Sequence, residues 1–390
     1  MIDFEPTDEQ RAIRETVRRF VDKELLPFEP LLMERDINGL EPHLTDAEER
    51  QLREKAKASG LWGVDTPEEY GGADLDWGTQ ALINMELGRT FIPFTFGGSA
   101  QEILYRLNDD QKRRYLVPTI QGEKRFCFML SEPGVGSDAR NIQTTAVRDG
   151  DGWVINGEKT WISRGNDADY GVAFCRTRDD SGTYGVTAFL VDRDMGWKSS
   201  PVPVMGVRNP ATISFQDVRV PDDNRFGEVN AGFDVAMRLI HRNRAVVMPA
   251  LWAGACERLL EMAIDYAKNR VTWGEPLADR ENIRFMIAES EVELRTLKLL
   301  TLHAAWVGDT GRDPRHSSCF TKFHGARVAN AIVDRVLQIH GGMGYSKELP
   351  IERWYRDFRI ARIYEGTDEI NLLSISRNLL RGYDKVGQVW

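Results

Sequence analysis

Residues 134–139, Gly134-Val135-Gly136-Ser137-Asp138-Ala139, form a glycine-rich segment after the β-prone run 126–130. Glycines allow backbone N–H groups to approach an anion closely, so this segment predicts a phosphate- or flavin-binding loop. The spacing also fits the dinucleotide pattern G-x-G-x-x-A, which requires a helix directly after it. Here Pro133 lies in the turn, and residues 141–147 are typical of another strand. The sequence therefore disfavours a Rossmann site.

A second candidate is Tyr364-Glu365-Gly366-Thr367, which precedes a predicted helix with Asp368 and Glu369 in its first turn. A carboxylate beside glycine has free space around it, and the neighbouring backbone N–H can serve a ligand. The alternative is an acid at a helix start that interacts favourably with the helix dipole. A third segment, 338–345, ends a helix with three glycines, which indicates either a simple helix stop or the close approach of a ligand.

The elements around these segments change character along the chain. Residues 1–118 read as helical, with capping boxes at Thr7-x-x-Gln10 and Thr45-x-x-Glu48. A helix stop is predicted at Ser59-Gly60, a further helix over 77–89, and one more capped by Asp109 or Asp110. Residues 125–220 carry short β-prone runs, and Asn156-Gly157 predicts a hairpin between two of them. A mostly antiparallel β domain is expected there, with strands over 170–175, 184–191 and 213–220.

Long amphipathic stretches return over 231–270, 282–307, 317–339 and 368–380, which indicates a helical bundle. The predicted fold class is α+β. We expect an N-terminal α-helical domain over 1–118, a middle β domain over 119–228 and a C-terminal bundle over 229–390. Strands and helices do not alternate, so Rossmann and TIM-barrel folds are disfavoured.

Composition excludes several classes of function. The chain has 390 residues, 42% of them hydrophobic, and a net charge of −9 that disfavours nucleic acid as a partner. Arginines 353, 356, 359 and 362 form a stripe at helical spacing, for which a solvated or salt-bridged face is the preferred interpretation. The four cysteines and six histidines show no metal-ligand spacing, so no metal is expected. The start shows no signal peptide and no apolar run spans a membrane, so we expect a reducing, cytoplasmic location, or the mitochondrial matrix in a eukaryote.

The chain resembles the acyl-CoA dehydrogenase flavoprotein family over essentially its whole length. Six motifs in family-like order carry the resemblance: 130–138 (LSEPGVGSD), 156–163 (NGEKTWIS), 215–221 (FQDVRVP), 270–274 (RVTWG), 338–342 (QIHGG) and 355–367, which holds YRD and IYEGT. The resemblance implies the same three-part fold, with FAD bound between the β domain and the bundle. It also implies a homodimer or homotetramer, an acyl-CoA substrate and an electron-transfer flavoprotein as electron acceptor.

The resemblance further implies roles for single residues. Phe128, Ser131 and Ser137 match flavin- or phosphate-contacting positions, and Trp161 and Ser163 match the segment that packs against the isoalloxazine. Arg270, Thr272, Gln338 and Gly342 match positions that hold a neighbouring subunit's FAD, and Thr367 and Glu369 match FAD contacts after the base. Arg244, Tyr364 and Gly366 are the expected substrate-side residues. Glu365 is expected to remove the α proton of the thioester while flavin N5 takes the β hydride, which gives the trans-2-enoyl-CoA. Some branches place the base on the helix of Arg244, but the matching residue here is Asn243, which cannot serve.

The sequence departs from the family pattern in three places. Glu281 stands where many members carry glutamine, Asn209-Pro210-Ala211-Thr212 replaces a common Gly-Ser-x-Thr, and His241 replaces a frequent acid on the CoA-facing helix. Two functions rival acyl-CoA dehydrogenation: a flavin oxidase or monooxygenase on the same fold, and a non-catalytic assembly module that keeps the FAD fold.

The segment 91–98 (FIPFTFGG) either shortens an acyl pocket with its rings or simply fills the core.

Overall fold

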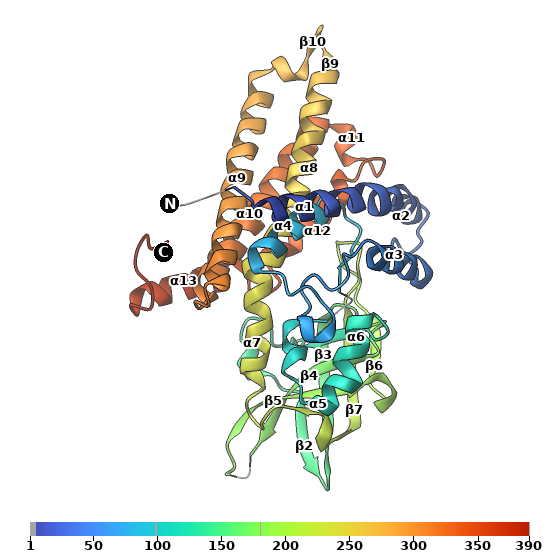
Figure 1. Cartoon of the computed structure of the whole chain (residues 1–390), viewed down its shortest axis with the longest axis vertical. Helices are drawn as coiled ribbons and strands as arrows, with labels where there is room; N and C mark the ends of the chain where they lie inside the picture. The colour runs from blue at the N-terminus through green and yellow to red at the C-terminus, as the bar shows by residue number, and fades with distance from the viewer. Residues whose placement is uncertain (1–4, 98–99, 180, 390) are drawn as a thin grey trace. The chain divides into compact units, whose positions relative to one another are not determined.

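The computed structural model describes residues 5–97, 100–179 and 181–389. Residues 1–4, on which the expectation for the chain start depends, lie outside the described residues. So does Gly98, the last residue of segment 91–98. The chain forms two compact units, one of Met1–Asp65, Gly72–Phe96 and His241–Trp390, the other of Thr66–Gly71 and Gly97–Ile240. The predicted order of helices, β-sheet and helices is confirmed (Figure 1). The first helices and the C-terminal bundle belong to the same unit.

The N-terminal helices begin where the sequence predicts. Both capping boxes form, at Thr7 and Thr45, and Gly60 follows the third helix with a φ of 69°. The prediction that Asp109 or Asp110 caps the next helix is wrong, because Asn108 accepts from the N–H of Gln111 and makes a capping box there. The bounds are α1 Asp8–Phe20, α2 Glu29–Ile37, α3 Asp46–Ala58, α4 Trp77–Leu87, α5 Asp109–Gln111 and α6 Val117–Gln121.

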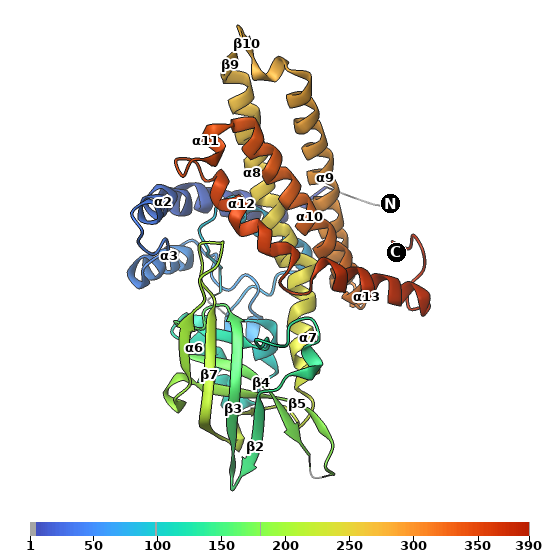
Figure 2. The same cartoon turned by 180° about the vertical axis from the view of Figure 1, so that it is seen from behind.

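The second unit contains a mostly antiparallel sheet, as predicted. Its hydrogen-bonded order is β6-β7-β3-β2-β4-β5-β8, and β1 pairs with β4 in parallel. Figure 2 shows β7, β3 and β2 side by side. The bounds are β1 Phe126–Met129, β2 Thr145–Asp149, β3 Gly152–Ile162, β4 Tyr170–Arg178, β5 Tyr184–Asp192, β6 Lys198–Pro201, β7 Ala211–Pro221 and β8 Arg225–Phe226.

The hairpin predicted at Asn156-Gly157 is wrong, because β3 runs through these residues without turning. The tight turn lies earlier, where Asp149 of β2 pairs with Gly152 of β3. Gly157 instead sits at an irregularity in the pairing of β3 with β7 and has a φ of 143°. A Cβ on Gly157 would lie 2.7 Å from the Cα of Thr144, so this glycine permits close backbone approach.

The C-terminal helices pack around α10, which contacts α8, α9, α12 and α13. Their core contains small and branched apolar side chains such as Leu259, Leu297, Ala329 and Ile332. No helix within the described ranges is both long and apolar enough to cross a membrane. The bounds are α7 Gly232–Arg242, α8 Met248–Asn269, β9 Val271–Thr272, β10 Glu275–Pro276, α9 Glu281–Asp309, α10 Arg315–His340, α11 Gly342–Tyr345, α12 Ile351–Arg359 and α13 Asp368–Leu380.

Of the four arginines of the stripe on and after α12, two form ion pairs and a third is buried over an aromatic ring. Arg356 pairs with Glu352 and Asp36, and Arg362 pairs with Asp368. Arg353 is buried and lies over the ring of Phe91, 4.1 Å from its centroid. These arginines therefore stabilise the helical unit, in agreement with the structural interpretation of the stripe.

Candidate active site

Glu365 lies in a tight turn between a short 3₁₀ turn, Ile360–Arg362, and the start of α13. Both Glu365 and Gly366 have positive φ angles, 51° and 90°. Thr367 ends the turn, because its side-chain oxygen accepts from the N–H of Ile370 and caps α13. A non-glycine residue at positive φ is strained, and such strain persists only where the surroundings hold it. The turn therefore presents Glu365 away from the helix rather than within its first turn.

The Glu365 carboxylate is buried beside an amide and two positively charged side chains. Asn243 Nδ2 donates to Oε1 at 3.2 Å, while Oε2 is buried and has no partner among the described residues. Burial raises the pKa of Glu365 to about 7, against the opposing effects of Arg244, Asn243 and Lys322. A carboxylate with this pKa can accept a proton near neutral pH.

A π-helical turn, Asn243–Val247, brings Asn243 and Arg244 to Glu365. The N–H of Met248 donates to the carbonyl of Asn243, five residues back, and Pro249 has no N–H to continue this register. Arg244 is 9% exposed, and its Nε has no partner in the described part of the chain. A Cβ on Gly366 would lie 2.5 Å from Arg244 Nη2, so the guanidinium would have to shift to admit a side chain, and the positive φ of Gly366 itself favours glycine.

Three further residues, Tyr364, His241 and Lys322, surround the site. Tyr364 directs its hydroxyl to Met248 Sδ at 3.2 Å and packs against Trp252, so its ring belongs to the bundle core. His241 lies 3.3 Å from Ser318 Oγ, and burial together with nearby Arg244 lowers the pKa of His241 to about 4. His241 is therefore neutral at pH 7. Lys322, which the sequence analysis missed, is buried and donates to the carbonyl of Gly366.

The aromatic segment after α4 fills the core. Phe94 and Phe96 pack against each other and against Phe20 of α1, with ring centroids 5.3–5.6 Å apart. Phe91 packs on Trp354 of α12. These rings therefore pack within the helical unit, which favours the interpretation that they fill the core over the interpretation that they form the floor of an acyl pocket.

The residues predicted for the flavin in the β unit lie on two neighbouring segments. Phe128 and Ser131 belong to β1 and the loop after it, Ser137 to the glycine-rich turn, and Trp161 and Ser163 to the end of β3. The N–H of Thr160 donates to the carbonyl of Ser131, which places these segments side by side. Trp161 has a φ of 61° and is 58% exposed. An exposed indole next to a glycine-rich turn suits a flat aromatic ligand.

A fully buried ion pair joins the same two segments. Lys159 Nζ donates to Glu132 Oε1 at 2.8 Å and to the carbonyl of Leu130 at 3.1 Å. Glu132 also accepts from the N–H groups of Gln143 and Thr144. Burial acts to raise the pKa of Glu132, but Lys159 and these N–H groups hold it below its ordinary value. The pair fixes the glycine-rich loop against β3.

The remaining predicted cofactor residues fall into two groups in the helical unit. Arg270 and Thr272 lie at the end of α8 and in the β9–β10 hairpin. Tyr266 stacks on His340 with ring centroids 4.4 Å apart, which brings them near Gln338 at the end of α10 and Gly342 at the start of α11. Thr367 and Glu369 lie by contrast beside Lys322, which is 16 residues earlier on α10 than Gln338. At a rise of about 1.5 Å per residue, the two groups are roughly 24 Å apart along α10.

The described residues fit FAD. The N–H groups of Gly136 and Ser137 have no protein acceptor within the described ranges, and a Cβ on Gly134 or Gly136 would meet open space. Such N–H groups in a glycine-rich turn suit a phosphate. Thr272 Oγ1 is buried and lacks a partner in the described chain, so a polar ligand group is accommodated at the hairpin as well.

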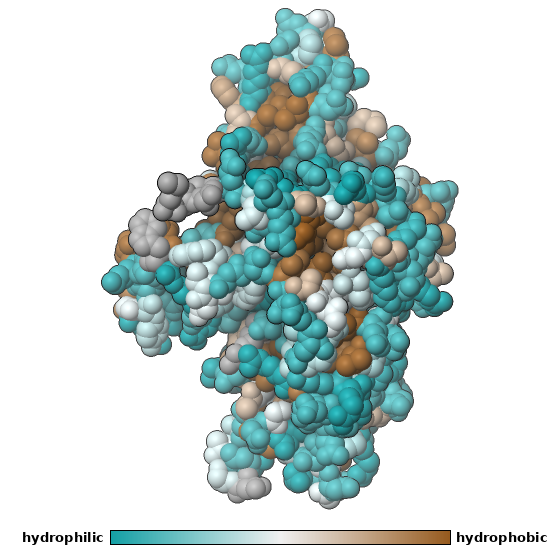
Figure 3. All heavy atoms as spheres, viewed as in Figure 1, coloured by the Kyte–Doolittle hydropathy of each residue, from teal (hydrophilic) through white to brown (hydrophobic). Residues whose placement is uncertain are grey.

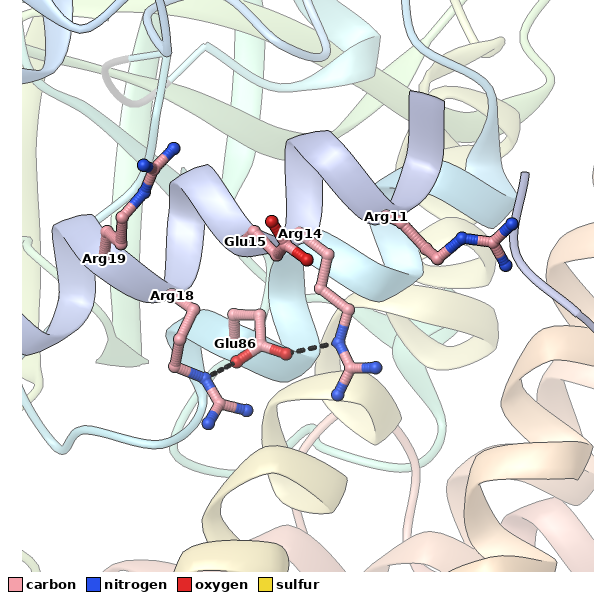
Figure 4. Close-up of a pocket in the computed structure, with 6 residues that line it drawn as sticks. All are labelled: Arg11, Arg14, Glu15, Arg18, Arg19 and Glu86. Atoms are coloured by element: carbon pink, nitrogen blue, oxygen red, sulfur yellow. Dashed lines mark hydrogen bonds and ion pairs between the residues drawn. The ribbon is translucent and has the colours of Figure 1, made fainter. Parts of the chain in front are cut away.

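A separate surface hollow on α1 contains none of the candidate residues (Figure 4). Arg14 and Arg18 both donate from Nε to Glu86, which is 1% exposed. Their charges are thus used to join α1 to α4, and we assign this hollow a structural role.

Comparisons with known proteins identify the chain. The acyl-CoA dehydrogenase N-terminal, middle and C-terminal domain models match residues 7–123, 127–218 and 230–380. The mitochondrial short-chain specific acyl-CoA dehydrogenase of Rattus norvegicus is 36% identical, over 96% of this chain and 90% of its own length. The caffeyl-CoA reductase–Etf complex subunit CarC of Acetobacterium woodii is 33% identical, over 96% of this chain and 99% of its own length.

Among solved structures, an FAD complex of PigA superposes with a TM-score of 0.87 at 26% identity. The match covers 98% of this chain and 100% of the PigA chain. The matched domain models, the relatives and the fit of the site to FAD agree with one another. The chain therefore belongs to the acyl-CoA dehydrogenase family of FAD-dependent oxidoreductases.

Proposed function

We propose that the chain catalyses the α,β-dehydrogenation of a short acyl-CoA thioester to the trans-2-enoyl-CoA, with Glu365 as the base. The observation that carries this proposal is the Glu365 carboxylate, whose Oε2 is buried without a partner among the described residues. An unpaired buried oxygen is ready to accept a proton, whereas a carboxylate held in an ion pair is not.

The reaction needs both removal of the α proton and stabilisation of the charge that develops on the thioester oxygen. Glu365 takes the proton and becomes neutral, which its raised pKa favours. The N–H groups of Glu365 and Gly366 donate to no protein acceptor in the described chain, so they are available to the thioester oxygen. FAD, when bound, supplies the acceptor for the β hydrogen and its electron pair. Arg244, held beside Gly366, keeps the positive charge of the site close to the base.

A short acyl group is supported by the packing behind the base. After the π-helical turn that carries Arg244, α8 runs from Met248 past Trp252 into close backbone contact with α4. A Cβ on Gly254 would lie 1.8 Å from the carbonyl oxygen of Met85, and one on Gly88 would lie 2.1 Å from that of Leu251. No acyl chain passes between helices this close. The short-chain specificity named for the rat relative agrees with this restriction.

The test is anaerobic bleaching of the bound flavin by a series of straight-chain CoA esters with branched, cyclic and aromatic esters beside it. In an open tunnel each methylene adds about 0.8 kcal/mol of burial, which is about fourfold in kcat/KM. We expect kcat/KM to be highest for the shortest esters and to fall as the chain lengthens. A steady rise to the longest straight chain would show that the packing of α4 on α8 does not limit the acyl group.

The proposed electron acceptor is an electron-transfer flavoprotein, since the Acetobacterium relative is named as a subunit of an Etf complex. A same-fold oxidase or monooxygenase would instead use oxygen. The two are separated by comparing oxygen consumption with electron transfer to such a flavoprotein after rapid anaerobic reduction. We expect slow oxygen consumption.

The proposed assembly is a homo-oligomer. Four exposed apolar residues follow one another at seven-residue intervals along α9, namely Phe285, Val292, Leu299 and Trp306, each at least 40% exposed. We call these residues the α9 stripe. Figure 3 shows brown apolar side chains exposed over the upper part of the helical bundle. An apolar face of this length marks an interaction site, and a second copy of the chain is the occupant we propose. The separation of the two cofactor groups along α10 supports the same conclusion, because the neighbouring copy can supply Arg270 and Gln338.

Val292→Glu should shift the protein toward smaller species, because a charge would be buried in the contact between copies.

Arg270→Glu should lose flavin and thermal stability together, since bound cofactor stabilises by mass action. Sedimentation velocity measures the size of the species formed by Val292→Glu, and flavin absorbance measures the flavin bound by Arg270→Glu. Arg50→Glu on α3, outside the stripe, is the charge-reversal control. A wild-type monomer with full FAD occupancy would contradict the proposal.

A further inference from the structure

Lys322 is a buried lysine whose charge has no ion-pair partner in the described chain. It lies in the first half of α10 and is 1% exposed. Its Nζ donates to the carbonyl of Gly366, and no described carboxylate comes within 4.0 Å of it. Burying an ammonium without a carboxylate partner is costly, and an apolar side chain of the same size would avoid that cost. The position therefore calls for an explanation beyond packing.

The contact with Gly366 holds the turn that carries the proposed base. The Gly366 carbonyl accepts from Lys322 Nζ and also from Asn371 Nδ2 at 2.8 Å, so both of its lone pairs are used. These bonds fix the peptide that follows Glu365, in a turn where Glu365 and Gly366 both have positive φ. A strained turn stays in one conformation only when such contacts over-determine it.

The residue before Lys322 holds the other half of the site. The single hydroxyl proton of Thr321 has three carbonyl oxygens within reach, and that of Arg244 is the nearest at 2.9 Å, with those of Ser317 and Ser318 at 3.0 and 3.2 Å. In the register of the π-helical turn that carbonyl faces Pro249, which has no N–H to offer, so Thr321 supplies the missing donor. Two consecutive residues of α10 therefore fix the segment that carries Asn243 and Arg244 and the turn that carries Glu365.

The two positive charges beside Glu365 come from two elements. From the π-helical turn it faces Arg244, and from α10 it faces Lys322. The other titratable or charged groups next to these are Cys319 and His241 beside Arg244, Asp368 and Glu369 beside Lys322, Arg362 paired with Asp368, and Tyr364 adjacent in the chain. Lys322 and Arg244 are the two cations that favour the ionised carboxylate.

We propose that Lys322 is a positioning residue for the base: its ammonium fixes the Glu365–Gly366 turn and keeps the Glu365 carboxylate ionised before the α proton is transferred. This inference rests on the proposed role of Glu365. Burial lowers the pKa of Lys322 to about 8, so the lysine is still mostly protonated at pH 7. Without the charge of Lys322, the neutral form of Glu365 is favoured over the ionised form. The pKa of Glu365 then rises, and a smaller fraction of the base is ionised at neutral pH.

The test uses the flavin-loaded full chain with Lys322→Met, which keeps the length and removes both the charge and the donor. Lys298→Met is the control, because Lys298 is a partly buried lysine of the same bundle that pairs with Glu257 on α8. The first readout is the pH profile of anaerobic flavin reduction. The second needs no turnover: the infrared band of the protonated carboxyl that Glu365→Gln removes is titrated in protein without acyl-CoA.

For Lys322→Met we expect the midpoint of both titrations to move up by about one pH unit, the size of effect expected for one neighbouring charge. Above the midpoint, flavin reduction should fall roughly tenfold to a hundredfold with a small change in KM, because the turn is displaced. Lys298→Met should change neither. An unchanged midpoint and rate in Lys322→Met, with activity lost in Glu365→Gln, would overturn this inference and leave the proposed function standing.

Should Lys322→Met fail to fold, Lys322→Gln decides the question, because it also removes the charge while keeping a polar group. The same upward shift of the infrared midpoint is expected, and an unchanged midpoint contradicts the inference. Full flavin reduction by Glu365→Gln, by contrast, would refute the base assignment itself, whatever the lysine variants show.

Discussion

Replacing Glu365 by glutamine should leave a yellow, folded protein whose flavin is no longer reduced by acyl-CoA at a useful rate. The amide has nearly the same shape, so the turn with Arg244 and Gly366 is kept, but it cannot accept the α proton. Because loss of the α proton and departure of the β hydrogen are coupled, we expect the reductive half-reaction to slow by roughly 10⁴-fold or more. Stopped-flow absorbance under anaerobic conditions measures this rate directly.

Glu54→Gln is a suitable control, since Glu54 lies exposed on α3 and pairs only with Lys57 among the described residues. It should reduce flavin at the wild-type rate. Substrate binding to Glu365→Gln is checked separately through the perturbation of the flavin spectrum by a non-reacting acyl-CoA analogue. Near-normal reduction in Glu365→Gln would refute the assignment, and a colourless variant would show that the substitution acts on cofactor binding instead.

Local sequence rules predicted the helices well because their signals are short-range. The capping boxes at Thr7 and Thr45 form as expected, and α13 spans the predicted residues 368–380. The same rules failed at Asn156-Gly157, where the dipeptide favours a two-residue turn. Pairing of β3 with β2 on one side and β7 on the other keeps the strand continuous, so the glycine serves close backbone approach instead. Tertiary contacts outweigh a turn propensity of this size.

The residues of the candidate site also differ in whether a local sequence signal indicates them. Glu365 and Gly366 could be found from their local motif, and Arg244 from its resemblance to a family position. Lys322 carried no local signal, because a lysine on an amphipathic helix is normally solvent-exposed. Its burial follows from the packing of α10 under the Glu365 turn, which no periodicity within α10 reveals. The phenylalanines after α4 show the converse, since an aromatic run gives no indication of whether it lines a pocket or fills a core.

The second large effect is expected at the ion pair between Glu132 and Lys159, whose side chains are 4% and 0% exposed. Lys159→Met leaves the Glu132 carboxylate buried without its cation. Removing one partner of a buried pair typically costs about 3–5 kcal/mol, so the free energy of unfolding of the flavin-free protein should fall by about that amount. FAD affinity should fall with it, because the pair holds the Ser131 loop against the strand that carries Trp161.

The double variant Glu132→Gln with Lys159→Met separates stability from positioning. Removing both charges eliminates the uncompensated carboxylate, so most of the lost stability should return. FAD affinity should recover less, since the amide and thioether no longer join the two segments. Urea unfolding of the apoprotein and fluorescence titration with FAD measure the two quantities, with Lys124→Met as the control. Lys124 is partly exposed and lies 3.8 Å from Asp192, a pair that should contribute less than about 1 kcal/mol. A single variant Lys159→Met as stable as the wild type would show that the pair does not hold the loop, and full recovery of FAD affinity in the double variant would show that it acts through stability alone.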